Sequence, residues 1–93
     1  MKAIWNNQVL AESEATVIVD SNHYFPASSI KCEFFKESDN KTFCPWKGEA
    51  SYYSIEVDGK TNNDAAWYYP DAKKKAEHIQ GMVAFWRGVQ VVE

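Results

Sequence analysis

The chain has 93 residues, a net charge of −3 and a pI near 5.3, with 45% hydrophobic and 25% charged residues. This length fits one domain over residues 1–93, and the balanced composition excludes intrinsic disorder. The acidic charge disfavours nucleic-acid partners, whose phosphates need basic groups. No apolar run approaches the roughly 20 residues that cross a bilayer, so we expect no membrane partner and a cytoplasmic location.

A hairpin is predicted at the N-terminus. Residues 3–5 and 9–11 flank an Asn-Asn-Gln turn at 6–8, and asparagine tolerates the positive φ that a tight turn needs. The next segment, residues 15–20, is rich in β-branched side chains and is typical of a buried strand. The first quarter of the chain is therefore expected to be β-structure.

Turns and strands are predicted to alternate after that segment. Pro26 suits the first position of a short helical turn over residues 27–30. Residues 32–36 are expected to be extended, with Cys32 in the core, and the polar residues 38–40 are expected to end that strand.

The clearest strand is predicted over residues 51–57, whose side chains alternate with period two. Tyr53 lies on the apolar face of this strand, and Tyr52 points to the opposite face. An Asp-Gly pair at 58–59 predicts a hairpin turn, followed by a returning strand over residues 60–62.

A further strand is expected over residues 65–69, before the only convincing helix, over residues 72–80. Asp71 is a plausible N-cap for this helix and Gly81 a C-terminal stop. The chain ends in a predicted hairpin about an Arg-Gly turn at 87–88, with Trp5 and Trp86 in the core. The sequence thus predicts a mainly β domain of antiparallel strands with one or two short helices.

Three side chains suggest thiol chemistry. Cys44 is a nucleophile only as a thiolate, whose formation Lys47 or a protonated His23 would favour. His23 is then the candidate base and Lys47 the anion-holding amine, so these three are the candidate catalytic residues. The alternatives are a small buried Cys44, a hydrogen-bonded structural His23 and a turn lysine at 47. Neither cysteine lies in the paired spacing of zinc sites, so no metal or other cofactor is predicted.

Aromatic residues suggest a binding site, because 15% of the chain is Phe, Trp or Tyr. Neighbours on a strand face opposite sides, so only one member of each adjacent pair of rings can line a pocket. Asp64 is interpreted either as a turn cap or as a carboxylate facing the site. The candidate ligand-binding residues are Tyr24, Trp46, Tyr52, Asp64, Trp67 and Tyr68.

Four blocks of sequence carry a family resemblance. They are residues 22–26 (NHYFP), 44–53 (CPWKGEASYY), 64–70 (DAAWYYP) and 83–89 (VAFWRGV). In this order they resemble a small microbial family, the domain of unknown function number 427, over essentially the whole chain. The resemblance implies a β-tent, or Mss4-like, fold of two antiparallel sheets meeting at an angle, a fold shared with methionine-R-sulfoxide reductases and with the ligand-binding domain of cereblon.

A nucleotidyltransferase label has also been attached to this family. The chain lacks the Gly-Ser and paired acidic residues that polymerase-type nucleotidyltransferases use to hold Mg²⁺, so its sequence does not support that activity. It also lacks the Cys-x-x-Cys zinc knuckles of many tent relatives. A metal-based activity is therefore not expected.

Three functions remain as hypotheses. The favoured one is a module that binds an unidentified small molecule in an aromatic-lined pocket. The second is a thiol enzyme, in its natural version a reductase, that uses Cys44. The third is an interaction protein whose exposed rings form a partner surface.

Overall fold

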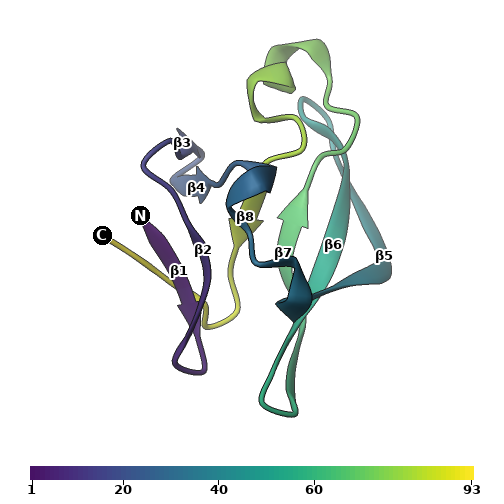
Figure 1. Cartoon of the computed structure of the whole chain (residues 1–93). Helices are drawn as coiled ribbons and strands as arrows, with labels where there is room; N and C mark the ends of the chain where they lie inside the picture. The colour runs from purple at the N-terminus through teal and green to yellow at the C-terminus, as the bar shows by residue number, and fades with distance from the viewer.

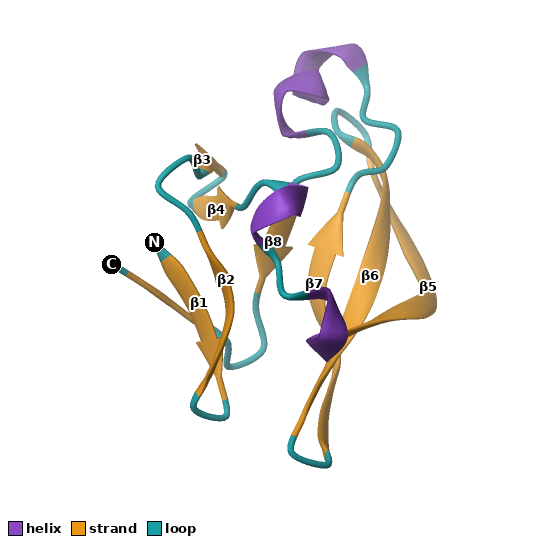
Figure 2. Ribbon diagram, viewed as in Figure 1, coloured by secondary structure: helices purple, strands orange, loops and turns teal.

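The computed structural model describes residues 1–93 and confirms the mainly β architecture (Figures 1 and 2). A three-stranded sheet has the order β2-β1-β9, made of β1 (Lys2–Trp5), β2 (Gln8–Glu12) and β9 (Gln90–Val92). A four-stranded sheet has the order β5-β6-β7-β8, made of β5 (Phe35–Cys44), β6 (Gly48–Val57), β7 (Lys60–Tyr68) and β8 (Val83–Phe85). A two-stranded ribbon pairs β3 (Val17–Val19) with β4 (Asn22–Tyr24). All pairings within these sheets are antiparallel.

The helical segments are three short 3-10 helices: η1 (Ala27–Ser29), η2 (Cys32–Phe34) and η3 (Lys74–Ile79). The chain contains no helix with both the length and the apolar character that a membrane crossing requires. The predicted turn after Pro26 is confirmed as η1.

Two of the three predicted hairpin turns are confirmed. Asn6 and Asn7 have φ values of 51° and 63°, and they join β1 to β2 through the Trp5–Gln8 pair. Asp58 and Gly59 have φ values of 50° and 76° and join β6 to β7. Two consecutive positive φ values are the geometry of the two-residue turns that match the twist of paired strands.

A strand does form within residues 15–20, but the prediction that this strand is buried is wrong. It forms one half of the β3–β4 ribbon, whose turn contains Asp20 and Ser21 with φ values of 52° and 67°. Only one face of this ribbon packs on the protein, so the side chain of Ile18 on the other face is 63% exposed. Because β-branched residues also suit half-exposed strands, the composition did not separate the two environments.

The predicted strand break at 38–40 is a bulge instead. Glu37 pairs with Tyr53 and Lys41 with Ser51, so four steps along β5 oppose two steps along β6. The polar residues between them bend the strand without ending it. The extended segment expected at 32–36 is also corrected, because η2 occupies its first part and β5 begins at Phe35.

A second bulge lies in β7, where two separate strands were predicted. Tyr53 pairs with Ala66 and Ile55 with Asn62, so two extra residues project from β7. One of them is Asp64, with φ 54°. The bulge lets one strand run from Lys60 to Tyr68 alongside residues 51–57 of β6.

The helix predicted at 72–80 is shorter and is a 3-10 helix that begins after Lys73. Its start is fixed by tertiary contacts, since the Lys73 N–H donates to the Lys47 carbonyl at 2.9 Å. The Asp71 cap was therefore predicted at the wrong position. The stop at Gly81, with φ 75°, is confirmed, and its N–H donates to the Tyr69 carbonyl.

The predicted C-terminal hairpin is wrong. β8 pairs with β7, whereas β9 pairs with β1 in the other sheet. The turn at Arg87 and Gly88 carries the chain from one sheet to the other (Figure 1). A local turn signal does not specify which strand the returning segment will join.

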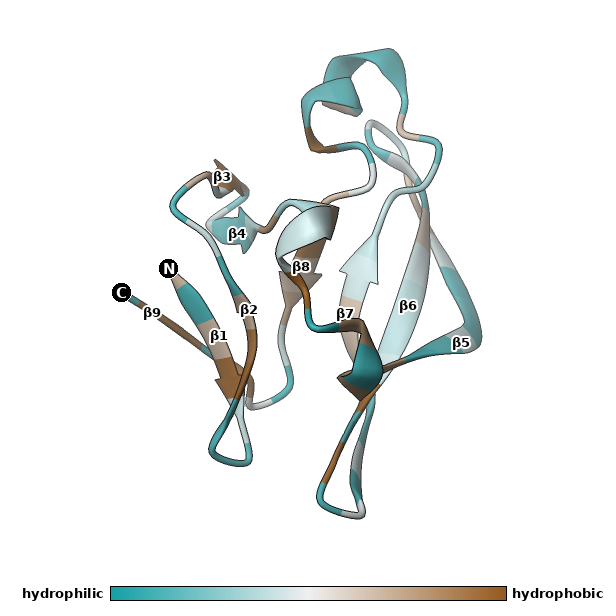
Figure 3. Cartoon of the chain, viewed as in Figure 1, coloured by the Kyte–Doolittle hydropathy of each residue, from teal (hydrophilic) through white to brown (hydrophobic).

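The two faces of the four-stranded sheet pack into two separate apolar clusters. The first, which we call the inter-sheet core, lies against the three-stranded sheet and contains Ala3, Leu10, Ala11, Phe25, Ile55, Val57, Ala65, Ala66, Val83 and Phe85. The second, the tyrosine cluster, contains Tyr24, Ala50, Tyr52, Tyr69, Ala76, Ile79 and Ala84. Figure 3 shows strongly apolar segments on β1, β2 and β8, whereas β5 is mostly hydrophilic.

The predicted side-chain alternation of β6 is confirmed by these clusters. Tyr53 packs against the inter-sheet core, as does Trp5, whereas Tyr52 belongs to the tyrosine cluster. Two core predictions are wrong, because Cys32 lies exposed at the start of η2 and Trp86 is 44% exposed beyond the end of β8.

Candidate functional site

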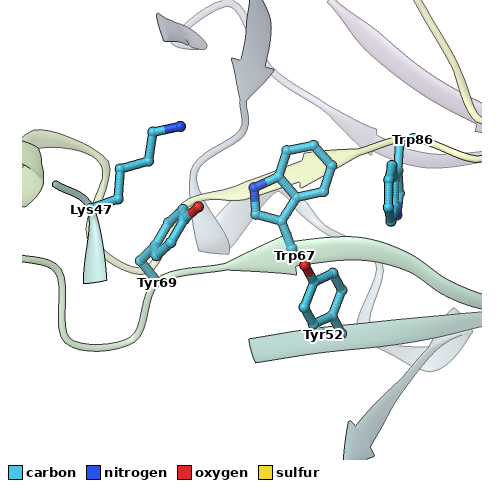
Figure 4. Close-up of a pocket in the computed structure, with 5 residues that line it drawn as sticks. All are labelled: Lys47, Tyr52, Trp67, Tyr69 and Trp86. Carbon is cyan, nitrogen blue, oxygen red and sulfur yellow. The ribbon is translucent and has the colours of Figure 1, made fainter. Parts of the chain in front are cut away.

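A pocket of about 140 Å³ opens on the tyrosine-cluster side of the four-stranded sheet (Figure 4). Its lining residues are Lys47, Tyr52, Trp67, Tyr69 and Trp86. Four of the five are aromatic, and the fifth carries an ammonium group. Engineered protein cavities of about 150 Å³ accept benzene, so this volume suits a single ring.

Trp67 is the central ring of the pocket and is held from two sides. Its indole N–H donates to the Tyr24 hydroxyl oxygen at 3.2 Å, and Tyr24 is completely buried. The Trp86 ring meets Trp67 edge to face, with centroids 5.8 Å apart and planes at 79°. Trp86 is itself fixed by its indole N–H, which donates to the Asp64 carbonyl. The apolar wall is therefore formed before any ligand arrives.

Tyr52 forms the floor beneath Trp67 in Figure 4. Its hydroxyl is hydrogen-bonded to the Thr42 hydroxyl at 2.8 Å. The pairing of Tyr52 with Trp67 across β6 and β7 places both rings on one face of the sheet.

Lys47 supplies the charge at the other end of the pocket. The residue is only 7% exposed, and its Nζ lies 2.6 Å from Oδ2 of Asp20 in the β3–β4 turn. The ammonium also lies 5.1 Å from the ring centroid of Trp46 and 5.9 Å from that of Tyr69. The buried cation thus has one carboxylate partner and two aromatic neighbours.

The backbone at the lysine end of the pocket restricts which residue can follow Lys47. Gly48 follows Lys47 with φ 111°, and a Cβ there would lie 3.3 Å from the Asp71 carbonyl oxygen. A larger residue would meet both a strained φ and a tight contact. The Lys-Gly pair and the Lys73–Lys47 main-chain bond therefore position the amine.

Two ionisable groups of the pocket have raised pKa values. Burial lowers the pKa of the Lys47 ammonium, but the hydrogen bond to Asp20, with Tyr24 and Tyr69 nearby, outweighs it and the pKa is raised. Burial, with Tyr24 nearby, raises the pKa of the Tyr69 phenol to about 12. At neutral pH the pocket therefore holds an ammonium and a protonated phenol.

The structure brings together most of the predicted ligand-binding residues. Tyr52 and Trp67 line the pocket, Tyr24 supports Trp67 from behind, and Trp46 covers the Lys47 amine from outside. Tyr68 lies on the opposite face, where it stacks on Tyr53 with centroids 4.6 Å apart.

Asp64 lies in the β7 bulge, where its N–H and its carboxylate are hydrogen-bonded to other side chains of the protein. Its N–H is bonded to the Ser54 hydroxyl at 3.1 Å, and its carboxylate accepts from the Asn40 side chain at 3.4 Å. Its contribution to the pocket is the carbonyl that holds Trp86.

The predicted catalytic residues are not brought together as a set. The imidazole Nδ1 of His23 lies 3.1 Å from the Thr16 hydroxyl, and His23 pairs across the ribbon with the exposed Ile18. Cross-strand partners share a face, so His23 points away from the tyrosine cluster, against which Cys44 packs. Lys47 is bonded to Asp20. No group of three or more His, Cys, Asp or Glu side chains is arranged to hold a metal ion.

Sequence reasoning missed two lining residues, Tyr69 and Trp86. Both lie two positions along from a residue of the tyrosine-cluster face, Tyr69 from Trp67 and Trp86 from Ala84. The period of a strand would have placed them on this face.

Comparison with protein families gives one result. A family model described as a domain of unknown function (DUF427) matches residues 1–93, the whole chain. No curated protein matches the chain. The match agrees with the resemblance carried by the four sequence blocks, and on this basis the chain belongs to the DUF427 family.

Proposed function

We propose that the protein is a small-ligand-binding module whose ligand places one planar ring in the pocket of Figure 4. The carrying observation is the pocket wall, in which Tyr52, Trp67 and Trp86 present rings around a space of about 140 Å³. Concave sites with an apolar aromatic lining and a few polar groups are typical of ligand binding.

The volume limits the ligand. Drug-sized molecules occupy pockets of about 300–1,000 Å³, so this pocket fits a single ring or one ring of a larger molecule. Each well-placed aromatic contact adds about 0.5–1.5 kcal/mol to the burial of the ring. A single-ring fragment should therefore bind with a Kd on the order of 1 mM.

The geometry favours binding over thiol chemistry. Activation of Cys44 requires a base or a free cation beside it. His23 is on the outer face of its ribbon, and Lys47 is engaged by Asp20. The two residues that would activate the thiol are therefore both engaged elsewhere.

The exposed rings also favour a pocket over a partner surface. The Lys73 ammonium lies 4.9 Å from the ring centroid of Phe43, and the Arg87 guanidinium lies 4.6 Å from that of Trp86. Apolar interaction surfaces are contiguous. Here a cation lies over the face of each of the two most exposed rings and interrupts the apolar surface.

The test is a two-dimensional NMR titration with a set of single-ring compounds, read at the indole N–H signals of the four tryptophans. Ligands should shift the Trp67 and Trp86 signals and leave that of Trp5, which packs on the inter-sheet core. Trp86→Ala should weaken binding about tenfold, whereas Phe43→Ala, which removes an exposed ring elsewhere, should not. If no ring compound shifts Trp67 and Trp86 at millimolar concentration, the proposal is wrong.

A further inference from the structure

The pocket presents two groups that can donate a hydrogen bond to a ligand. The Lys47 ammonium is one, and the Tyr69 hydroxyl is the second. Figure 4 shows the Tyr69 oxygen turned toward Trp67, in the middle of the lining. An ammonium can only donate, so it favours a ligand that carries an acceptor, because an unmatched group on either side loses its bonds to water.

The buried ammonium of Lys47 also requires an anion beside it. Lys47 is almost fully buried, and a buried ammonium is stable only with a negative partner. The protein supplies this partner itself, since Oδ2 of Asp20 lies 2.6 Å from Nζ. The lysine end of the pocket is therefore shaped to hold a carboxylate.

The two members of this ion pair differ in burial. The side chain of Lys47 is 9% exposed, whereas that of Asp20 is 58% exposed. Asp20 sits in the two-residue turn of a ribbon, so a change of its rotamer returns the carboxylate to water without disturbing a sheet. A ligand carboxylate would keep the buried Lys47 ammonium paired while the Asp20 carboxylate returned to water, so Asp20 is a partner that can be replaced.

We propose that the ligand is a ring-bearing carboxylate, with its ring against Trp67 and Trp86 and its carboxylate taking the place of Asp20 beside Lys47. This inference rests on the proposed function, because it assumes that the pocket binds a ring. The pocket volume of about 140 Å³ fits the ring of such a ligand. Tyr69 donates its hydroxyl proton to the second carboxylate oxygen or to a ring substituent.

The experiment compares benzoate with benzamide, which have nearly the same shape and differ in charge. Their dissociation constants are measured by the indole NMR titration, and the readout is the affinity ratio of benzoate to benzamide. Asp20→Asn removes the competing carboxylate and keeps an acceptor near Lys47, so it should raise the ratio about 3- to 10-fold. Lys47→Met should lower the ratio about tenfold.

Two exposed residues provide matched controls. Asp39→Asn changes the net charge by the same amount as Asp20→Asn, and Lys60→Met matches Lys47→Met. Neither control should change the ratio by more than about twofold, because exposed charges outside the site are screened.

A second measurement uses the unmodified protein, so it does not depend on the folding of a variant. Displacement of Asp20 should shift the backbone amide signals of Asp20, Ser21 and Asn22 on addition of benzoate but not of benzamide. These residues form the turn and its flank, and they do not line the pocket.

The outcomes separate the two proposals. If both compounds bind and the ratio stays constant in Asp20→Asn and Lys47→Met, the carboxylate inference is wrong and the binding function stands. The inference is also wrong if benzoate binds while the turn amides stay unshifted. If neither compound nor any other single-ring molecule shifts Trp67 and Trp86, both proposals are wrong.

Discussion

The two faces of the four-stranded sheet bury different kinds of side chain. On the inter-sheet core side, the rings of Phe25, Phe35 and Phe85 meet edge to face at 5.5–5.9 Å and surround aliphatic residues. On the tyrosine-cluster side, Tyr24, Tyr52 and Tyr69 bring hydroxyl groups. A second sheet closes the first face, whereas only η3 and the β3–β4 ribbon pack on the second.

This difference separates stability from recognition. Apolar side chains packed between two sheets give a large transfer free energy and need no polar partner. The tyrosine cluster contains polar groups that need partners, and its incomplete cover leaves the pocket open. We therefore expect changes in the first region to act on folding and changes in the second to act on binding.

The strongest test of this separation is Ile55→Ala. Ile55 is completely buried in the inter-sheet core, and its truncation should lower the free energy of unfolding by about 2–5 kcal/mol. Urea denaturation followed by tryptophan fluorescence measures this loss. At temperatures where the variant is folded, its affinity for benzamide should match that of the unmodified protein. A loss below about 1 kcal/mol would mean that the inter-sheet core does not dominate stability.

The next largest effect on stability should come from the Lys47–Asp20 ion pair on the tyrosine-cluster side. The loss should differ according to which partner is removed. Asp20→Ala leaves the buried Lys47 ammonium without its carboxylate, which should cost about 1–3 kcal/mol. Lys47→Met leaves Asp20 exposed to water and should cost less than about 1 kcal/mol. Equal losses in the two variants, measured by urea denaturation, would contradict the assignment of the buried partner.

Alkaline pH should reduce the stability that Tyr69 and Lys47 contribute on the tyrosine-cluster side. Burial, with Tyr24 nearby, raises the pKa of Tyr69 to about 12, above its ordinary value of 10.0, so folding favours the protonated phenol. This contribution is complete below pH 10 and is lost as the pH rises toward 12. The raised pKa of Lys47 acts in the same direction, since its contribution is lost as the pH rises through the folded-state value.

The measurement is the free energy of unfolding at several values between pH 9 and pH 12, compared with Tyr69→Phe. The variant should lose less stability over this range, and its phenolate absorbance should lack one late-ionising group. Equal pH profiles for the two proteins would show that Tyr69 does not carry the effect.

The smallest effect concerns the two thiols. Cys32 is exposed, whereas Cys44 is half-buried against the tyrosine cluster, so iodoacetamide should modify Cys32 faster at neutral pH. Peptide mass spectrometry after timed quenching gives both rates from one sample. Faster modification of Cys44 would support the thiol-enzyme hypothesis. It would also contradict the view that the tyrosine-cluster side acts in binding alone.

Local signals in the sequence predicted the local structure well. The Asn-Asn and Asp-Gly turns form as expected, because residues that tolerate positive φ determine a hairpin within a few positions. The alternation of β6 correctly separated Tyr53 from Tyr52. These features depend on neighbours in the chain.

Features that depend on distant contacts were not predictable in the same way. The Arg-Gly turn gave no sign that β9 joins β1, and the polar residues at 38–40 form a bulge because β6 continues beside them. Trp86 was placed in the core as part of a C-terminal hairpin that does not form. Its exposure follows from the short length of β8 and from the Asp64 carbonyl that holds its indole.

The candidate site was predicted in part for the same reason. Lys47, Tyr52 and Trp67 were selected from two sequence blocks, and the structure places all three around one pocket. The partner of Lys47 was missed, since Asp20 lies 27 positions earlier and approaches through the fold of the β3–β4 ribbon.

A crystal structure of the protein soaked in benzoate tests the binding site directly. We expect the ring to lie against Trp67 and Trp86, the carboxylate to contact Lys47 Nζ, and the Asp20 side chain to turn into solvent. Benzoate bound away from the pocket, with Asp20 still paired to Lys47 and the rings of the pocket uncovered, would contradict the proposal that this face of the sheet is a binding site.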